Sequence, residues 1–156
     1  MPETAQKISG KISAGENLKG LPYLVLDNVR IFNRNDVYAF RTLFWWGNFF
    51  SYTVHISGNY FNQLKPVLPS ILNQLDSELT FICIQNDQWQ YHFGPDNYLP
   101  LKEVKINESA INKILQNGFI KISGKSAIDL PELALHNAFK FYEEFLKVLS
   151  KNIRTL

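Results

Sequence analysis

The clearest pattern of hydrophobic and polar positions lies in residues 37–57, where two runs rich in aromatic and β-branched side chains flank Gly47 and Asn48. Runs of this composition favour β-strands, and glycine at the first position of a two-residue turn accepts the positive φ of a type II′ hairpin. We therefore predict a tight hairpin in which Trp46 lies opposite Phe49.

This register gives the hairpin two different faces, because successive residues of a strand alternate between the faces of a sheet. The face expected to join the core carries Arg41 among apolar residues, namely Ala39, Leu43, Trp45, Phe50, Tyr52, Val54 and Ile56. The other face mixes rings, hydroxyl groups and one imidazole in Tyr38, Phe40, Thr42, Phe44, Trp46, Phe49, Ser51, Thr53 and His55. So many rings predict either a second core layer or the wall of a binding groove.

The rest of the chain alternates between strand patterns and helical patterns. Further strands are expected at residues 23–26, 79–85, 88–93, 99–105 and 119–123. Residues 61–75 have helical spacing but contain Pro66 and Pro69, which predicts a kinked or restarted helix. Asn107 is expected to cap the start of a short helix.

The C-terminal region has the strongest helical period. Asp129 and Glu132 resemble a capping box at its start. The predicted buried stripe of this helix consists of Leu135, Ala138, Phe139, Tyr142, Phe145, Leu146, Leu149 and Ile153. We expect the stripe to pack on the sheet, because a helix with one apolar face is stabilised mainly by burying that face.

Hairpins with a few intervening helices predict an α+β fold. We expect two layers, a mostly antiparallel sheet of about 6 to 7 strands with the C-terminal helix and shorter helices on one face. A chain of 156 residues is typical of one domain. The prediction is a single domain over residues 1–156, with a polar lead-in at 1–20 and a compact core at 21–156.

Composition and charge limit the partners and the cellular location that we expect for the protein. The formal net charge is only +2, from 16 basic and 14 acidic residues, which argues against nucleic acid as a partner. The longest apolar-leaning run, residues 43–50, is far shorter than the ~20 residues that cross a bilayer. With a single cysteine, Cys83, and no secretory signal in the sequence, we expect a cytoplasmic protein without membrane contact.

Familiar catalytic motifs do not fit the sequence. Gly124 is followed by Lys and Ser, as in a P-loop, but five residues separate it from Gly118 where that loop has four. His55, His92 and His136 lack the spacing of metal ligands. We therefore predict no catalytic residue, no metal and no cofactor.

Arg41 stands out because a guanidinium group on a core face needs an anionic partner. One interpretation is an ion pair with Asp27, Asp36 or another carboxylate. The other is that Arg41 binds a ligand carboxylate or phosphate through two hydrogen bonds.

These observations favour a non-enzymatic module that uses its aromatic face to bind a small apolar or anionic ligand, or to pair with another protein or a second copy of itself. The predicted ligand-binding residues are Tyr38, Phe40, Arg41, Thr42, Phe44, Trp46, Thr53 and His55. The alternative is an enzyme in which His55 or His92 acts as a general base in the same groove.

Overall fold

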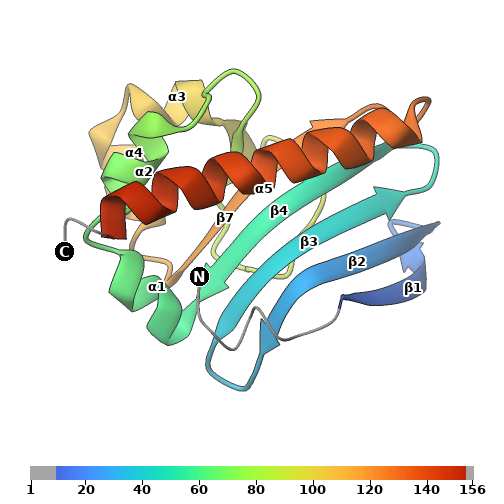
Figure 1. The fold of residues 1–156 in the computed structure, drawn as a ribbon, viewed down its shortest axis with the longest axis horizontal. Helices are drawn as coiled ribbons and strands as arrows, with labels where there is room; N and C mark the ends of the chain where they lie inside the picture. Colours follow the sequence, from blue (N-terminus) through green and yellow to red (C-terminus); the bar gives the residue numbers. More distant parts are fainter. Residues whose placement is uncertain (1–9, 154–156) are drawn as a thin grey trace.

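The computed structural model describes residues 10–153. Its strands are β1 (Lys11–Leu18), β2 (Leu21–Phe32), β3 (Val37–Trp45), β4 (Phe49–Ser57), β5 (Phe81–Cys83), β6 (Tyr98–Pro100) and β7 (Phe119–Ser126). Its helices are α1 (Gly58–Leu64), α2 (Leu68–Gln74), α3 (Leu101–Lys105), α4 (Glu108–Ile114) and α5 (Pro131–Ile153). In the described residues the strands form one antiparallel sheet, ordered β1-β2-β3-β4-β7-β5-β6 (Figure 1). The predicted α+β class is confirmed.

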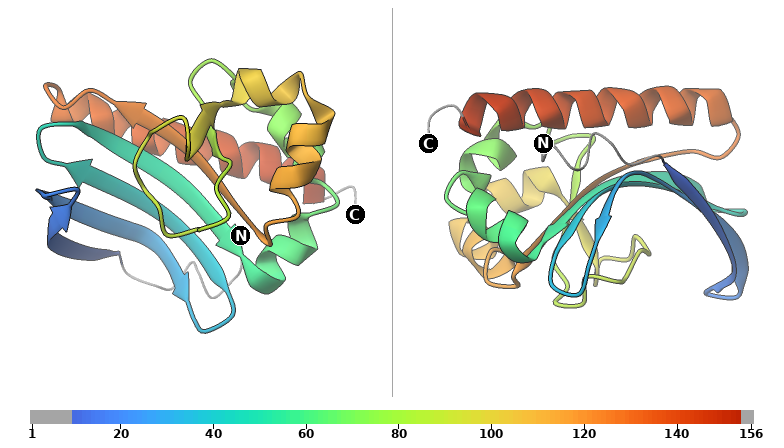
Figure 2. Two further views of the ribbon diagram at one scale, coloured as in Figure 1. Left: turned by 180° about the vertical axis from the view of Figure 1, so that it is seen from behind. Right: turned by 60° about the horizontal axis from the view of Figure 1, so that its bottom comes forward.

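The two faces of the sheet have different covers. Helix α5 lies along one face, and segment 84–97, the irregular stretch between β5 and β6, lies against the other (Figure 2). The helix face carries Phe40, Val54 and Ile122, which belong to the main hydrophobic core with α5 and the shorter helices. The opposite face carries Arg41 and Lys121, which form hydrogen bonds to segment 84–97. Strands β1 and β2 curl away from α5 (Figure 2).

The N-terminal region differs from the prediction. Residues 11–18, expected within a polar lead-in, form strand β1 and pair with β2; residues 1–9 of that lead-in lie outside the described part of the chain. The pattern of β1 was weak because the strand lies at an edge of the sheet and none of its side chains is fully buried. An edge strand with one face open to solvent and the other only partly covered needs little apolar alternation.

The predicted hairpin of β3 and β4 is present, but its register was predicted wrongly. Trp46 belongs to the turn, in which Asn48 N donates to Trp45 O at 3.0 Å and Gly47 has a φ of 72°. Positive φ at the third position of a four-residue turn is the requirement of a type II turn. Trp45 therefore lies opposite Phe49.

This shift of one residue in the pairing changes which side chains share a face, because the side chains of β4 move to the opposite face relative to those of β3. Even-numbered residues of both strands share the helix face, so that Phe40 pairs with Val54. Odd-numbered residues share the opposite face, so that Arg41 pairs with Thr53 and Ala39 with His55. The predicted aromatic set is thus divided between the two faces.

The second predicted hairpin is only half present. Strand β5 forms, but residues 88–93 are not a strand, and of residues 99–105 only the first two continue β6 before helix α3 begins. Within the described chain, residues 88–93 form hydrogen bonds to side chains of the sheet and not to the backbone of a neighbouring strand. The side chain of Gln88 contacts His55, and the backbone carbonyl of Gln90 accepts a hydrogen bond from Lys121.

Several local predictions are confirmed. The helical pattern of residues 61–75 is divided into α1 and α2, as the two prolines predict. Asn107 caps α4, since its side-chain oxygen accepts from Ala110 N at 3.1 Å. The strand expected at residues 119–123 is the first part of β7.

Helix α5 is present, but its buried stripe is rotated from the predicted one. Ala138, Tyr142, Phe145 and Leu149 are buried as expected. Leu135, Phe139 and Ile153 were expected in the stripe but are 46%, 61% and 41% exposed. The stripe instead includes Ala134, Val148 and Asn152. The helix packs on β4 and β7, whereas β1 and β2 curl away from it (Figure 2). Among the described residues, Leu135 and Phe139 border a pocket that they share with Leu26 of β2.

Candidate functional site

A cavity of about 310 Å³ lies between strands β1 to β3 and segment 84–97, on the sheet face opposite α5. It is lined by Ser13, Ala14, Leu18, Tyr23, Val25, Asp27, Arg41, Leu43, Trp89 and Tyr91. Small-molecule sites have volumes of roughly 300 to 1,000 Å³ and combine mostly apolar walls with a few placed polar groups. The size and lining of this cavity place it at the lower end of that class.

The alternation of two strands builds most of the wall. Tyr23, Val25 and Asp27 follow one another at every second position of β2, so they point to the same face. On β3, Leu43 lies directly opposite Val25, and Arg41 lies directly opposite Asp27. The part of the wall formed by β2 and β3 therefore has apolar side chains at one end and a pair of opposite charges at the other.

Arg41 and Asp27 form the ion pair that the sequence left as one of two interpretations. Arg41 Nε donates to Asp27 Oδ1 at 2.7 Å, and Nη2 donates to Oδ2 at 2.9 Å. Nη1 donates to the hydroxyl of Tyr91 at 2.6 Å. Burial disfavours the charge, but the hydrogen bond to Asp27, the negative charge of that carboxylate and the contact with Tyr91 raise the pKa of Arg41 above its ordinary value. This bidentate geometry is the strongest form of such a pair.

Lys121 adds a second cation to the same buried layer. Its side chain is fully buried on β7, and Nζ donates to the backbone carbonyl of Gln90. The ammonium group lies 4.2 Å from the ring centroid of Tyr91. Burial lowers the pKa of Lys121 to about 8, so the amine is still mostly protonated at pH 7. Within residues 10–153 no carboxylate forms an ion pair with it.

His55 lies beneath segment 84–97 and does not line the cavity. It is 1% exposed, its Nε2 lies 2.8 Å from Gln88 Oε1, and its ring centroid lies 5.5 Å from that of Trp89. Burial lowers the pKa of His55 to about 3, so the ring is neutral near pH 7. Its Nδ1 is buried without a hydrogen-bond partner in the described chain.

The structure does not bring the eight predicted ligand-binding residues together. Arg41 lines the cavity, and Thr53 and His55 lie buried beside it on the same face. The other five are elsewhere: Tyr38, Phe40, Thr42 and Phe44 on the helix face, and Trp46 in the turn with 60% exposure.

The helix-face residues have structural contacts to α5. The Phe40 ring stacks on the ring of Tyr142 at a centroid distance of 4.8 Å. The Thr42 hydroxyl lies 3.3 Å from the Tyr142 hydroxyl. These side chains form the packing between sheet and helix, which corresponds to the core-layer interpretation of the aromatic face.

Of the lining residues, sequence reasoning named only Arg41 and its possible partner Asp27. It missed the other eight, among them Tyr23, Trp89 and Tyr91, and also Lys121, which lies in the same buried layer without lining the cavity. Only Lys121 had a visible signal, since a lysine between Ile120 and Ile122 shares a strand face with Phe119 and Ser123. Its place beside His55 depends on the pairing of β4 with β7, which the sequence left undetermined.

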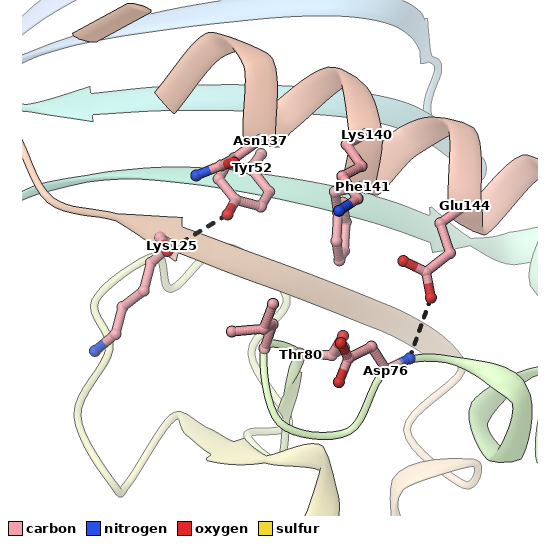
Figure 3. Close-up of a pocket in the computed structure, with 9 residues that line it drawn as sticks. Tyr52, Asp76, Thr80, Lys125, Asn137, Lys140, Phe141 and Glu144 are labelled. Atoms are coloured by element: carbon pink, nitrogen blue, oxygen red, sulfur yellow. Dashed lines mark hydrogen bonds between the residues drawn. The ribbon is translucent and has the colours of Figure 1, made fainter. Parts of the chain in front are cut away.

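A smaller cavity of about 170 Å³ lies on the helix side of the sheet (Figure 3). It is lined by Tyr52, Asp76, Leu79, Thr80, Lys125, Asn137, Lys140, Phe141 and Glu144. Glu144 accepts a hydrogen bond from the backbone of Asp76 at 3.2 Å, and the amine of Lys125 points away from the other lining side chains (Figure 3). None of its charged side chains is buried, so it offers a ligand weaker electrostatic contacts than the larger cavity.

No group of three or more His, Cys, Asp or Glu side chains in residues 10–153 could hold a metal ion. No helix in the same range is both long enough and apolar enough to cross a membrane. Comparison of the chain with known protein families, with curated protein sequences and with solved structures gives no match.

Proposed function

We propose that the protein is a non-enzymatic module that binds a small molecule in the cavity between β1 to β3 and segment 84–97. The observation that carries this proposal is the cavity itself, of about 310 Å³, with Arg41 and Asp27 in an otherwise largely apolar and aromatic wall. A wall of this composition supports a ligand with an apolar body and one polar group. The body lies against Val25, Leu43 and Tyr23.

The ring of Trp89 supports the same proposal from the other side of the cavity. Trp89 is 52% exposed although it is a large aromatic residue, and it belongs to an irregular segment. A bound apolar group that covers part of this ring gains the free energy of removing apolar surface from water, about 25 cal/mol for each Å².

The experiment is isothermal titration calorimetry with small apolar acids, amides and amines, on the wild type and two variants. Ser13→Phe places a ring into the cavity from the edge strand β1, where space is available. Ile12→Phe is the matched control, because Ile12 is the preceding residue, is 73% exposed and does not line the cavity. We expect at least one compound to bind the wild type and Ile12→Phe but not Ser13→Phe. Equal binding by Ser13→Phe, or no binding by the wild type, would reject the proposal.

The alternative of an enzyme with a histidine general base has less support. His55 is buried outside the cavity lining, and burial lowers its pKa to about 3, which makes it a weak base. His92 lies 3.1 Å from Asp96 Oδ2 in segment 84–97 and is not a lining residue either. General bases work best when their pKa lies near the operating pH.

Pairing with another protein or with a second copy remains a prediction. Exposed apolar side chains do occur on the face of the sheet that carries α5, on α5 itself and in the turn between β3 and β4, among them Ile12, Leu24, Trp46 and Phe139. Nothing in the described residues identifies what would cover them, so the cavity carries the proposal.

A further inference from the structure

We infer that the ligand of this cavity is a small monocarboxylic acid, whose carboxylate binds the terminal nitrogens of Arg41. This inference rests on the proposed function and specifies the charge of the ligand. Three observations carry it: unused donors on Arg41, an excess of positive charge in the buried layer, and the absence of a free carboxylate from the described residues of the cavity wall.

The first observation concerns the hydrogen bonds of Arg41. A guanidinium group has five N–H donors, and the described residues accept from three of them, through Asp27 and Tyr91. One N–H remains on each of Nη1 and Nη2. The Arg41 side chain is also the more exposed partner of the pair, at 18% against 8% for Asp27. Both oxygens of a carboxylate can accept from such terminal nitrogens, with charge assistance.

The second observation concerns the charge of the layer. Asp27 neutralises Arg41, but Lys121 brings a further positive charge with which no described carboxylate forms an ion pair. The carboxylate of Asp87 attracts Lys121 electrostatically, but it is not buried, so water screens most of this attraction. Tyr91 contacts both cations, because its hydroxyl accepts from Arg41 and its ring lies 4.2 Å from Lys121 Nζ. A single excess positive charge in a region of low dielectric favours a bound anion. One negative charge balances it, which favours a carboxylate over a doubly charged phosphate.

The third observation excludes the opposite charge. Among residues 10–153, Asp27 is the only acidic residue in the lining, and both of its oxygens already accept hydrogen bonds from Arg41. An ammonium ligand would meet this carboxylate beside the guanidinium of Arg41, with Lys121 as a second cation in the layer behind the lining. A neutral ligand could use the apolar wall but would gain nothing from the charge of the layer.

The test measures the affinity of the intact protein for sets of three related compounds, an acid, an amide and an amine, by calorimetry at pH 7 and low ionic strength. Each small monocarboxylic acid, with an aliphatic or aromatic body, is measured beside its primary amide and its amine counterpart; phenylacetate, phenylacetamide and phenethylamine are one such set. We expect the acid to bind about tenfold tighter than the amide or more, as a charge-assisted hydrogen bond implies. The amine should bind most weakly.

The charge of the layer is tested separately with Lys121→Met. This variant removes the excess charge and leaves Arg41 and Asp27 in place, and methionine packs well where the lysine stem was buried. We expect the preference for acid over amide to fall several-fold. Arg41→Lys, which keeps a cation but loses the bidentate geometry, should also lower this preference.

The outcomes distinguish the inference from the proposed function. Equal binding of acid and amide, or tighter binding of the amine, overturns the inference while the proposed function stands. Failure of every acid, amide and amine to bind overturns both. An unchanged preference in Lys121→Met also overturns the inference, because the excess charge would then have no effect on the ligand.

Discussion

The guanidinium group of Arg41 and the carboxylate of Asp27 form a bidentate ion pair, at 2.7 and 2.9 Å, across adjacent strands of the sheet. The pair exists because β2 and β3 place these two residues directly opposite each other. It explains how a charged side chain is tolerated against the apolar cavity wall. It also fixes the position of the Arg41 terminal nitrogens that we propose bind the ligand.

Loss of one partner of this pair should destabilise the protein strongly. Arg41→Met leaves the Asp27 carboxylate buried and unpaired, which typically costs about 3 to 5 kcal/mol. The double variant Arg41→Met with Asp27→Leu should recover most of that loss, since it removes both charges of the pair and leaves neither one buried alone. Urea unfolding measures both, with Arg34→Met in the exposed turn after β2 as control. A loss below about 1 kcal/mol in the single variant would contradict a buried pair.

Lys121 should make the stability of the protein depend on alkaline pH. Burial lowers the pKa of Lys121 from 10.5 to about 8, so between these values the unfolded chain binds a proton that the folded protein does not. Stability therefore rises with pH across this window, as a penalty of about 3 kcal/mol present below pH 8 is lost.

The measurement is the difference in unfolding free energy between wild type and Lys121→Met, at several values from pH 7 to 9.5. Taking the difference removes the contribution of the tyrosines, which both proteins share. The wild type should gain stability relative to the variant as the pH rises. A difference that does not change with pH would show that the Lys121 pKa is not lowered.

His55 should make the protein less stable in acid. Its pKa is lowered from 6.5 to about 3 by burial, so the unfolded chain binds a proton in this range and the folded protein does not. Stability should fall by about 1.4 kcal/mol for each pH unit well below 6.5. The variant His55→Gln should lack this part of the slope. Nuclear magnetic resonance provides the direct check, since movement of the His55 ring signals between pH 5 and 8 would contradict a buried neutral ring.

The side of α5 that is buried predicts losses of stability of very different size for two phenylalanines of this helix. Phe145 is fully buried, whereas Phe139 is 61% exposed. Phe145→Ala should cost about 3 to 5 kcal/mol because it leaves a cavity in the core. Phe139→Ala should cost less than about 1 kcal/mol. Similar losses in thermal unfolding for both variants would favour the stripe expected from the sequence.

Alternation and helical period were sufficient to predict the class of the fold, because most strands and helices bury one face. They could not decide the register of the β3–β4 hairpin. Trp46 suits a strand as well as a turn, and only the positive φ of Gly47 at the third turn position settles its place. An error of one residue then moved Arg41 to a different set of neighbours.

The candidate site was predictable only in part for a related reason. Arg41 and its alternative partner Asp27 could be named from the sequence, because a charge on a buried face requires an opposite charge. Trp89 and Tyr91 could not be placed, since they belong to an irregular segment whose position depends on contacts with distant strands. Lys121 joins the site only through the pairing of β7 with β4, which no local pattern specifies.

The central claim, that the cavity holds a small molecule, is tested most directly by native mass spectrometry of the protein purified from its own cells. The account predicts an added small mass in the native spectrum that disappears on denaturation. The same mass should be missing from Ser13→Phe and present in Ile12→Phe. A bare native mass for the wild type, or the same added mass in Ser13→Phe, would contradict the assignment of the site.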